Sequence, residues 1–122
     1  MRLLLDTHAL VWWWLEDVRL PPHAREAIRA FRNDVLVSAV AAWEVANKYR
    51  IGKWPEVGGV VANFPRLVAD AGFHSLPIVA GHALLGGGLS GRHKDPFDRL
   101  IAAQALTHGL TMVTTEVRLW SW

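Results

Sequence analysis

The feature that most constrains the fold of this chain is a regular alternation of short apolar runs with longer segments of helical character. The runs Leu3–Leu5, Val35–Val37, Phe73–Pro77 and Leu110–Thr114 predict short strands, three of them rich in core residues. Helix signals occupy the segments between them. This order predicts an α/β fold, a three-layer α/β/α sandwich with a mainly parallel central sheet.

The predicted helices are defined by start and stop signals as well as by periodicity. They span residues 8–15, 22–31, 39–51, 78–85 and 96–108. Ser38 is expected to cap the third of these helices, and Gly52 to end it. Residues 60–71 have mixed helical periodicity, in which Pro65 predicts a kink. Gly86-Gly87-Gly88 predicts the start of a flexible loop that continues to Lys94.

Length and composition narrow the class of protein. A chain of 122 residues that is 52% hydrophobic is expected to form one domain, residues 1–122, with a buried core. It has no cysteine, so any metal must bind oxygen or imidazole ligands, and a reducing cytoplasm is the expected location. Asp6 interrupts the apolar N-terminal run, which argues against a signal peptide. The apolar stretch Ala9–Leu15 is too short to cross a bilayer, so no membrane association is expected.

Charge and tryptophan content favour a binding partner but do not identify it. The formal charge of +2 favours approach to a polyanion, but the arginines and lysines are scattered along the chain. Three of the seven tryptophans, Trp12, Trp13 and Trp14, are consecutive. Because successive helical side chains are about 100° apart, they cannot all face one core. We expect at least one of them on an outer or partner-facing surface.

Acidic residues recur at the points where predicted strands end. Asp6 ends the first strand, and Glu116 lies two residues beyond Thr114. Glu44 and Asp98 lie near the starts of two predicted helices. Ligands of parallel α/β sheets collect beyond the carboxyl ends of the strands, so we expect these four acids on one rim.

Four carboxylates on one rim would repel one another unless a cation joined them. Mg²⁺ or Mn²⁺ is the natural choice for oxygen ligands, although His8 and His93 keep zinc conceivable. An ion with open coordination positions can hold a phosphodiester, lower the pKa of a water and neutralise charge on the phosphate oxygens. The pattern therefore favours phosphodiester hydrolysis.

Each acid also has a simpler interpretation. Asp6 is a natural cap for the helix that follows it. Glu44 and Lys48 have the spacing of an exposed helical ion pair. Glu116 is acceptable as an ordinary loop acid. From the residues alone these alternatives stay open.

The segment Asp95–Asp98 has its own alternative. Asp95 can cap the helix, with Pro96 at the first helical position and Asp98 where an acid favours the helix dipole. No metal is needed to explain that pattern.

Four motifs in order resemble the PIN-domain ribonucleases, especially the VapC-like toxins of bacterial toxin–antitoxin pairs. They are Leu4–Ala9 (LLDTHA), Ser38–Lys48 (SAVAAWEVANK), His93–Ala105 (HKDPFDRLIAAQA) and Gly109–Glu116 (GLTMVTTE). A single DTH or DPFD motif would be weak evidence. All four, in this order and spacing, span almost the whole chain.

The resemblance implies a Mg²⁺- or Mn²⁺-dependent endoribonuclease that leaves a 5′-phosphate and a 3′-hydroxyl. It implies Asp6 and Asp98 as the principal metal ligands, with Glu44 and Glu116 completing the pocket directly or through water. Asp95, Thr7 and Thr114 are expected to position these groups. The expected phosphate contacts are Lys48, Arg92, Lys94 and Arg99, of which Arg99 could equally hold the carboxylates.

The same resemblance implies a homodimer and a cognate antitoxin whose C-terminal segment lies in an apolar groove. Exposed members of Trp12–Trp14, together with Trp43 and Trp54, are candidates to line that groove, although Trp43 could equally fill core volume. Two features depart from the family pattern. Glu116 stands where relatives usually have Asp, and the chain ends at Trp122, where many relatives continue into another strand.

Three other classes of protein are alternatives to a nuclease. A non-catalytic PIN-like module that binds RNA or protein is the main alternative, with Glu116 as a sign of lost activity. A receiver domain needs an acidic pair after the first strand and an acceptor Asp after the third, which this chain lacks. A phosphatase that starts with DxD is disfavoured by Asp6-Thr7-His8.

Overall fold

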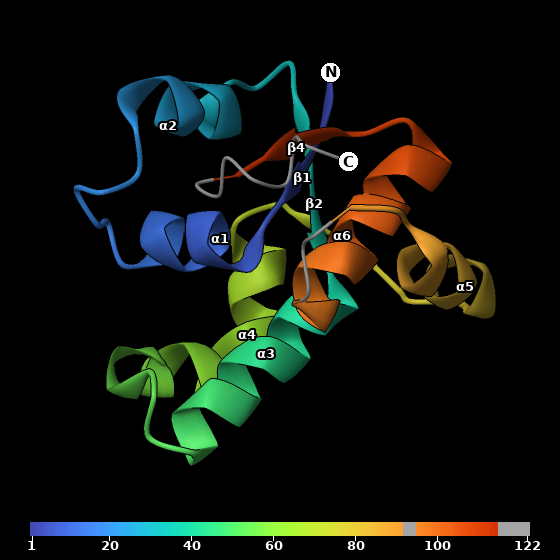
Figure 1. Cartoon of the computed structure of the whole chain (residues 1–122). Coiled ribbons are helices and arrows are strands. Elements are labelled where there is room, and N and C mark those ends of the chain that lie inside the picture. The colour runs from blue at the N-terminus through green and yellow to red at the C-terminus, as the bar shows by residue number, and fades with distance from the viewer. Residues whose placement is uncertain (92–94, 115–122) are drawn as a thin grey trace.

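A single four-stranded sheet forms the centre of the fold in the computed structural model, which describes residues 1–91 and 95–114 (Figure 1). Its strands are β1 (Arg2–Leu5), β2 (Asp34–Ser38), β3 (His74–Leu76) and β4 (Thr111–Val113). They lie in the order β3-β2-β1-β4, and every neighbouring pair is parallel. Leu5 is in register with Val37 on one side and Val113 on the other. The carboxyl ends of these three strands therefore meet at one edge.

Helices connect the strands and cover both faces of the sheet. They are α1 (Thr7–Trp14), α2 (Pro22–Arg29), α3 (Ala39–Arg50), the short 3₁₀ helix η1 (Pro55–Val57), α4 (Gly58–Asp70), α5 (Ala80–Gly88) and α6 (Pro96–His108). Figure 1 shows α1 and α2 on one side of the strands, and α5 and α6 on the other. Among the described residues, no helix has both the length and the apolar character needed to cross a bilayer.

The core follows the two-residue alternation of side chains along a strand. One face of the sheet carries Leu3, Leu5, Val35 and Val37, which pack against residues of α1, α2 and α4. The opposite face carries Leu4 and Leu36, which pack against Val40 and Ile101 from α3 and α6. Two apolar layers thus flank the sheet, and the expected three-layer α/β/α architecture with a parallel sheet is confirmed.

Local signals in the sequence set several helix ends. Ser38 Oγ accepts a 3.1 Å hydrogen bond from the Val40 amide, as expected of a cap. Gly52 follows α3 with a left-handed φ of 77°, which glycine adopts without strain. The kink expected near Pro65 is present, because Asn63 leaves helical geometry with φ −126°. These predictions are confirmed.

The glycine run is where the prediction is wrong. Gly86, Gly87 and Gly88 belong to α5 and do not begin the loop. Gly86 is buried against α6, and a Cβ there would lie 3.1 Å from the carbonyl oxygen of Arg99. The Arg99 Nε donates a 2.9 Å hydrogen bond to the Gly86 carbonyl, and a second guanidinium nitrogen donates to Leu89. Packing and these bonds outweigh the low helix propensity of glycine.

The three consecutive tryptophans lie at the boundary of the core. Each is half-buried and packs against the apolar cluster on the α1 side of the sheet. Trp13 contacts Phe73 at 6.5 Å between ring centroids, and Trp14 contacts Phe64 at 5.3 Å. The tryptophan that the described part of the chain leaves most open is Trp43, which is 59% exposed.

A candidate acidic site at the carboxyl edge of the sheet

Asp6 occupies the position where β1 gives way to α1, and both of its carboxylate oxygens are engaged. Oδ1 accepts a 2.7 Å hydrogen bond from the Ala9 amide, so Asp6 does cap α1. Oδ2 accepts a 2.6 Å hydrogen bond from Thr114 Oγ1. The residue is only 3% exposed. The Asp6 carboxylate therefore caps α1 and also takes part in the polar site at this edge of the sheet.

Two threonines flank Asp6 at this edge. Thr114 directly follows β4, whose parallel pairing with β1 brings its hydroxyl to Asp6. Thr7 is the first residue of α1 and is 2% exposed. Its Oγ1 is buried and has no hydrogen-bond partner within residues 1–91 and 95–114. A buried hydroxyl of this kind is available to a ligand or water at the site.

Glu44 lies on α3 with its side chain turned into the protein. It is 2% exposed, and its Oε2 accepts a 2.5 Å hydrogen bond from Lys48 Nζ. The pair expected from the sequence is therefore present, but the interpretation of Glu44 as an exposed ion pair is wrong. Glu44 Oε1 is buried and finds no hydrogen-bond partner in the described part of the chain. An unsatisfied carboxylate oxygen in such a place is costly, and a bound cation would remove that cost.

Asp98 lies in the first turn of α6, and Asp95 precedes that helix. Asp95 Oδ1 accepts hydrogen bonds from the amides of Phe97, at 2.9 Å, and Asp98, at 3.4 Å. The capping interpretation of Asp95 is confirmed. Burial, followed by the charges of Asp95, Glu44 and Asp6, raises the pKa of Asp98 to about 7, against a smaller lowering effect of Lys48. Three separate elements thus place their acids within electrostatic reach of Asp98.

These acids fit a hard divalent cation. A cation would relieve the repulsion that raises the pKa of Asp98, and it would satisfy the buried Glu44 Oε1. Within the described ranges, no group of three or more histidine, aspartate or glutamate side chains is already arranged to hold a metal ion. Mg²⁺ tolerates this because it usually retains several waters and binds through one or two carboxylates.

The remaining expected site residues divide into two groups. Arg99 donates hydrogen bonds to the carbonyl of Gly86 in α5 and to the carbonyl of Leu89 directly after it, so it ties the end of α5 to α6. Arg92, His93, Lys94 and Glu116 lie outside the described residues.

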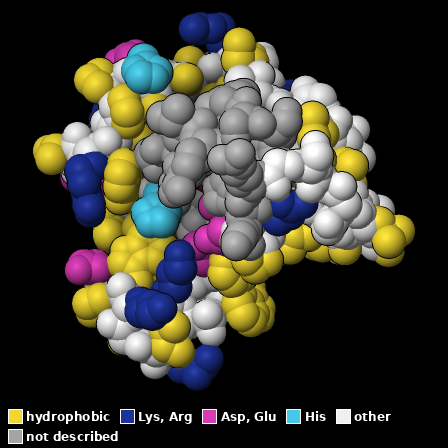
Figure 2. All heavy atoms as spheres, in the orientation of Figure 1, with side chains coloured by type: hydrophobic (Ala, Val, Ile, Leu, Met, Phe, Trp, Pro, Cys, Tyr) yellow, Lys and Arg dark blue, Asp and Glu magenta, His cyan; other side chains and the backbone are white. Residues whose placement is uncertain are grey.

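The structure adds an aromatic neighbour that the sequence did not indicate. His8 stacks on Trp54 with ring centroids 4.8 Å apart and planes 28° apart. The two residues are far apart in the sequence, so no local spacing could have revealed the pair. Figure 2 shows a histidine and several lysine and arginine side chains beside acidic side chains, on the face that carries α1 and α3.

Comparison with known proteins agrees with this architecture. The PIN domain family matches residues 3–119. Ribonuclease VapC22 of Mycobacterium tuberculosis (strain ATCC 25618 / H37Rv) is 34% identical over 123 residues, covering 98% of this chain and 90% of that protein. VapBC2 from Rickettsia felis, in a crystal structure with a DNA fragment from its promoter, includes a chain that is 18% identical, with a TM-score of 0.70. That match covers 99% of this chain and 92% of the other, and it shows the fold alone. This chain belongs to the PIN domain family.

Proposed function

We propose that this protein is a divalent-metal-dependent endoribonuclease and the toxin of a toxin–antitoxin pair. The observation that carries the proposal is the group of acids around Asp98, whose pKa is raised to about 7 by burial and by Asp95, Glu44 and Asp6. Membership of the PIN domain family and the similarity to Ribonuclease VapC22 support RNA as the substrate.

Asp6, Glu44 and Asp98 are the residues proposed to hold Mg²⁺ or Mn²⁺. Glu116 is proposed as the fourth acid on its place in the sequence alone. The chemistry that a bound ion supplies is Lewis acidity, which lowers the pKa of a water and neutralises charge on the phosphate oxygens.

The protein's own groups prepare the site for that chemistry. The Ala9 amide and the Thr114 hydroxyl hold the two oxygens of Asp6 in one orientation. Lys48 compensates the buried charge of Glu44 at Oε2 and leaves Oε1 available. With a pKa of about 7, the Asp98 carboxyl holds a proton in part of the molecules at neutral pH and gives it up when a cation arrives. Thr7 and Asp95 are proposed to position these groups.

The partners are part of the same proposal. A cognate antitoxin is proposed from the similarity to Ribonuclease VapC22. We propose a homodimer as well, with Trp43 among the exposed aromatic residues available for contacts between chains. Lys48, Arg92, Lys94 and Arg99 are proposed to contact phosphate.

A cleavage assay tests the proposal. Purified protein is incubated with single-stranded RNA in Mg²⁺ or Mn²⁺ and in EDTA, and the product ends are mapped. We expect cuts that leave a 5′-phosphate and a 3′-hydroxyl, that require the metal and that Asp6→Asn abolishes. Asp34→Asn is the control, because Asp34 is exposed at the start of β2. RNA that stays intact, together with equal RNA binding by wild type and Asp6→Asn, would favour a non-catalytic binding module.

A further inference from the structure

Five side chains from α1, α3 and the segments that follow these two helices form a row in which three aromatic rings lie between two cations. Lys48 Nζ lies 5.7 Å from the centroid of the Trp54 ring, and Trp54 stacks on His8 at 4.8 Å. The rings of His8 and Trp12 meet in a T-shaped arrangement with centroids 6.0 Å apart, and the guanidinium carbon of Arg19 lies 4.8 Å from the centroid of the Trp12 ring. A cation therefore stands at each end of three consecutive rings.

One end of this row is joined to the acidic site. Lys48 Nζ, the first member, donates the 2.5 Å hydrogen bond to Glu44 Oε2. His8, in the middle, is the second residue after Asp6 at the start of α1. The row thus leads away from the proposed cleavage site.

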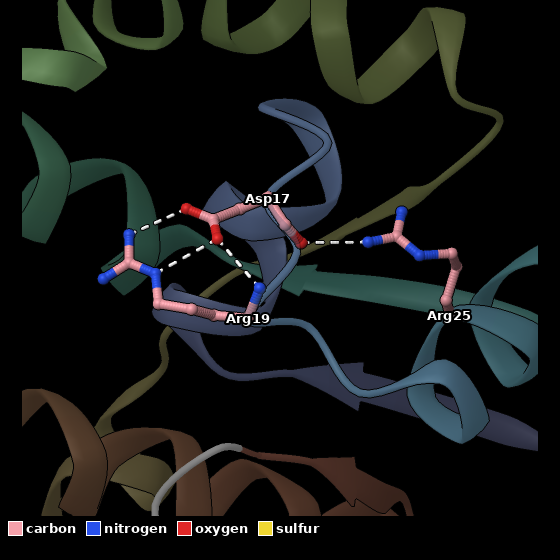
Figure 3. A network of polar contacts seen from close by, with 3 residues as sticks. All are labelled: Asp17, Arg19 and Arg25. Atoms are coloured by element: carbon pink, nitrogen blue, oxygen red, sulfur yellow. Dashed lines mark hydrogen bonds and ion pairs between the residues drawn. The ribbon is translucent and has the colours of Figure 1, made fainter.

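The other end is held by a polar network that fixes an otherwise exposed cation (Figure 3). The Arg19 guanidinium donates to both carboxylate oxygens of Asp17, at 3.1 and 2.7 Å, although its side chain is 66% exposed. Arg25 donates a 2.9 Å hydrogen bond to the Asp17 carbonyl from α2. The bonds from Arg19 lower the pKa of Asp17 to about 2, so Asp17 stays charged. Arg19 is therefore held in place over Trp12.

The middle of the row is accessible from solvent. His8 is exposed although it stacks nearly parallel on Trp54, whereas its chain neighbours Thr7 and Ala9 are buried. An imidazole displayed on an indole offers a rigid aromatic surface at low entropic cost, as nucleobase-binding sites do. Aromatic rings with a cation at each end offer contacts for both the bases and the phosphates of a single strand.

We propose that this row is a binding track for single-stranded RNA, in which His8 and Trp54 stack an unpaired base next to the scissile phosphate. Lys48 and Arg19 contact the flanking phosphates. His8 is a positioning residue, and a paired base would have to leave its duplex to reach it. The inference rests on the proposed function for the identity of the ligand.

A fluorescence titration tests the track. Single-stranded RNA carrying one 2-aminopurine is titrated with the full chain bearing Asp98→Asn, so that the RNA stays intact. Each of His8→Ala, His8→Phe and His23→Ala is added to that background. His23 is the matched control, because it is an exposed histidine that lines a pocket with Met1 and Asn33 at the amino ends of β1 and β2.

We expect the fluorescence of the stacked base to be quenched, and His8→Ala to abolish the quenching and weaken binding about 5- to 100-fold. His8→Phe retains both, and His23→Ala behaves as the parent. Arg19→Gln, whose site is exposed, reduces the slope of log Kd against log salt by about 0.7, one phosphate contact on a single strand.

Quenching and affinity that are unchanged in His8→Ala would overturn the track. The same result with weakened antitoxin binding would assign the row to a protein partner. The proposed function is judged separately by cleavage with the wild-type chain, so a protein that cuts RNA without quenching would refute only the track. A protein that quenches without cutting would refute only the nuclease.

Discussion

Thr114 Oγ1 donates a 2.6 Å hydrogen bond to Asp6 Oδ2 across the parallel pair formed by β4 and β1. The two residues are 108 positions apart in the chain, and only the sheet order brings them together. The hydroxyl leaves the Asp6 carboxylate little freedom to rotate, since the Ala9 amide holds its other oxygen.

Replacing this hydroxyl tests its positioning role. Thr114→Val keeps the side-chain shape and removes the donor, so we expect metal affinity to fall about 10- to 100-fold, as for other groups that orient a metal ligand. Thr114→Ser restores most of it. Titration with Mn²⁺ followed by calorimetry measures both variants. Equal affinities in Thr114→Val and wild type would show that Asp6 needs no such support.

The buried pair of Lys48 and Glu44 predicts that removing Lys48 lowers stability more without metal than with it. Lys48→Met leaves the Glu44 carboxylate buried without its cation, and we expect the free energy of unfolding to fall by about 2–4 kcal/mol in EDTA. Urea unfolding in EDTA and in Mg²⁺ measures the effect. Added Mg²⁺ should restore more stability to Lys48→Met than to wild type.

A double variant provides the control for that loss. In Lys48→Met with Glu44→Gln no charge is left buried, so most of the lost stability should return, and the response to Mg²⁺ should shrink. Additive losses from the two substitutions would contradict a coupled pair.

The raised pKa of Asp98 predicts a specific dependence of stability on pH without metal. Its pKa rises from 3.8 to about 7 on folding, so the folded state binds more protons between those values. Stability from this group is therefore complete below pH 4, is lost as the pH rises towards 7 and is flat above it. Urea unfolding in EDTA from pH 4 to 8 should show this decline in wild type, and the difference from Asp98→Asn isolates it.

The same group links protons to metal. Because the carboxylate binds the ion, Mg²⁺ affinity should increase with pH up to about 7, and binding near pH 6 should release a proton. Calorimetry in two buffers of different ionisation enthalpy detects that proton. Identical heats in both buffers would contradict the raised pKa.

The contact of α5 with α6 gives a prediction about packing. Gly86→Ala places a Cβ 3.1 Å from the backbone oxygen of Arg99, so we expect a loss of about 1–3 kcal/mol. Gly87→Ala is the matched control, because its Cβ meets nothing within 4 Å in the described structure and alanine favours a helix. Thermal unfolding compares the two. Equal midpoints would show that the helices are not closely packed at Gly86.

Strand positions and helix caps could be predicted because they depend on nearby residues. Ser38, Asp95 and Gly52 act through bonds or backbone angles within a few positions. The grouping of Asp6 and Glu44 around Asp98 was also accessible, since a parallel sheet brings its carboxyl ends to one edge, whereas Glu116 lies outside the described residues. The end of α5 and the stacking of His8 on Trp54 could not be predicted from the sequence, because each depends on a partner far away in the chain. The metal roles of Asp6, Glu44 and Asp98 stay predictions.

The rate of RNA cleavage as a function of Mg²⁺ concentration, in wild type and Asp98→Asn, tests the central claim most directly. Asp70→Asn is the control, because Asp70 is exposed at the end of α4. We expect a wild-type rate that saturates with Mg²⁺ and vanishes in EDTA, a loss of about 100-fold or more in Asp98→Asn, and no change in Asp70→Asn. Cleavage by Asp98→Asn at the wild-type rate, or cleavage that persists in EDTA, would contradict it.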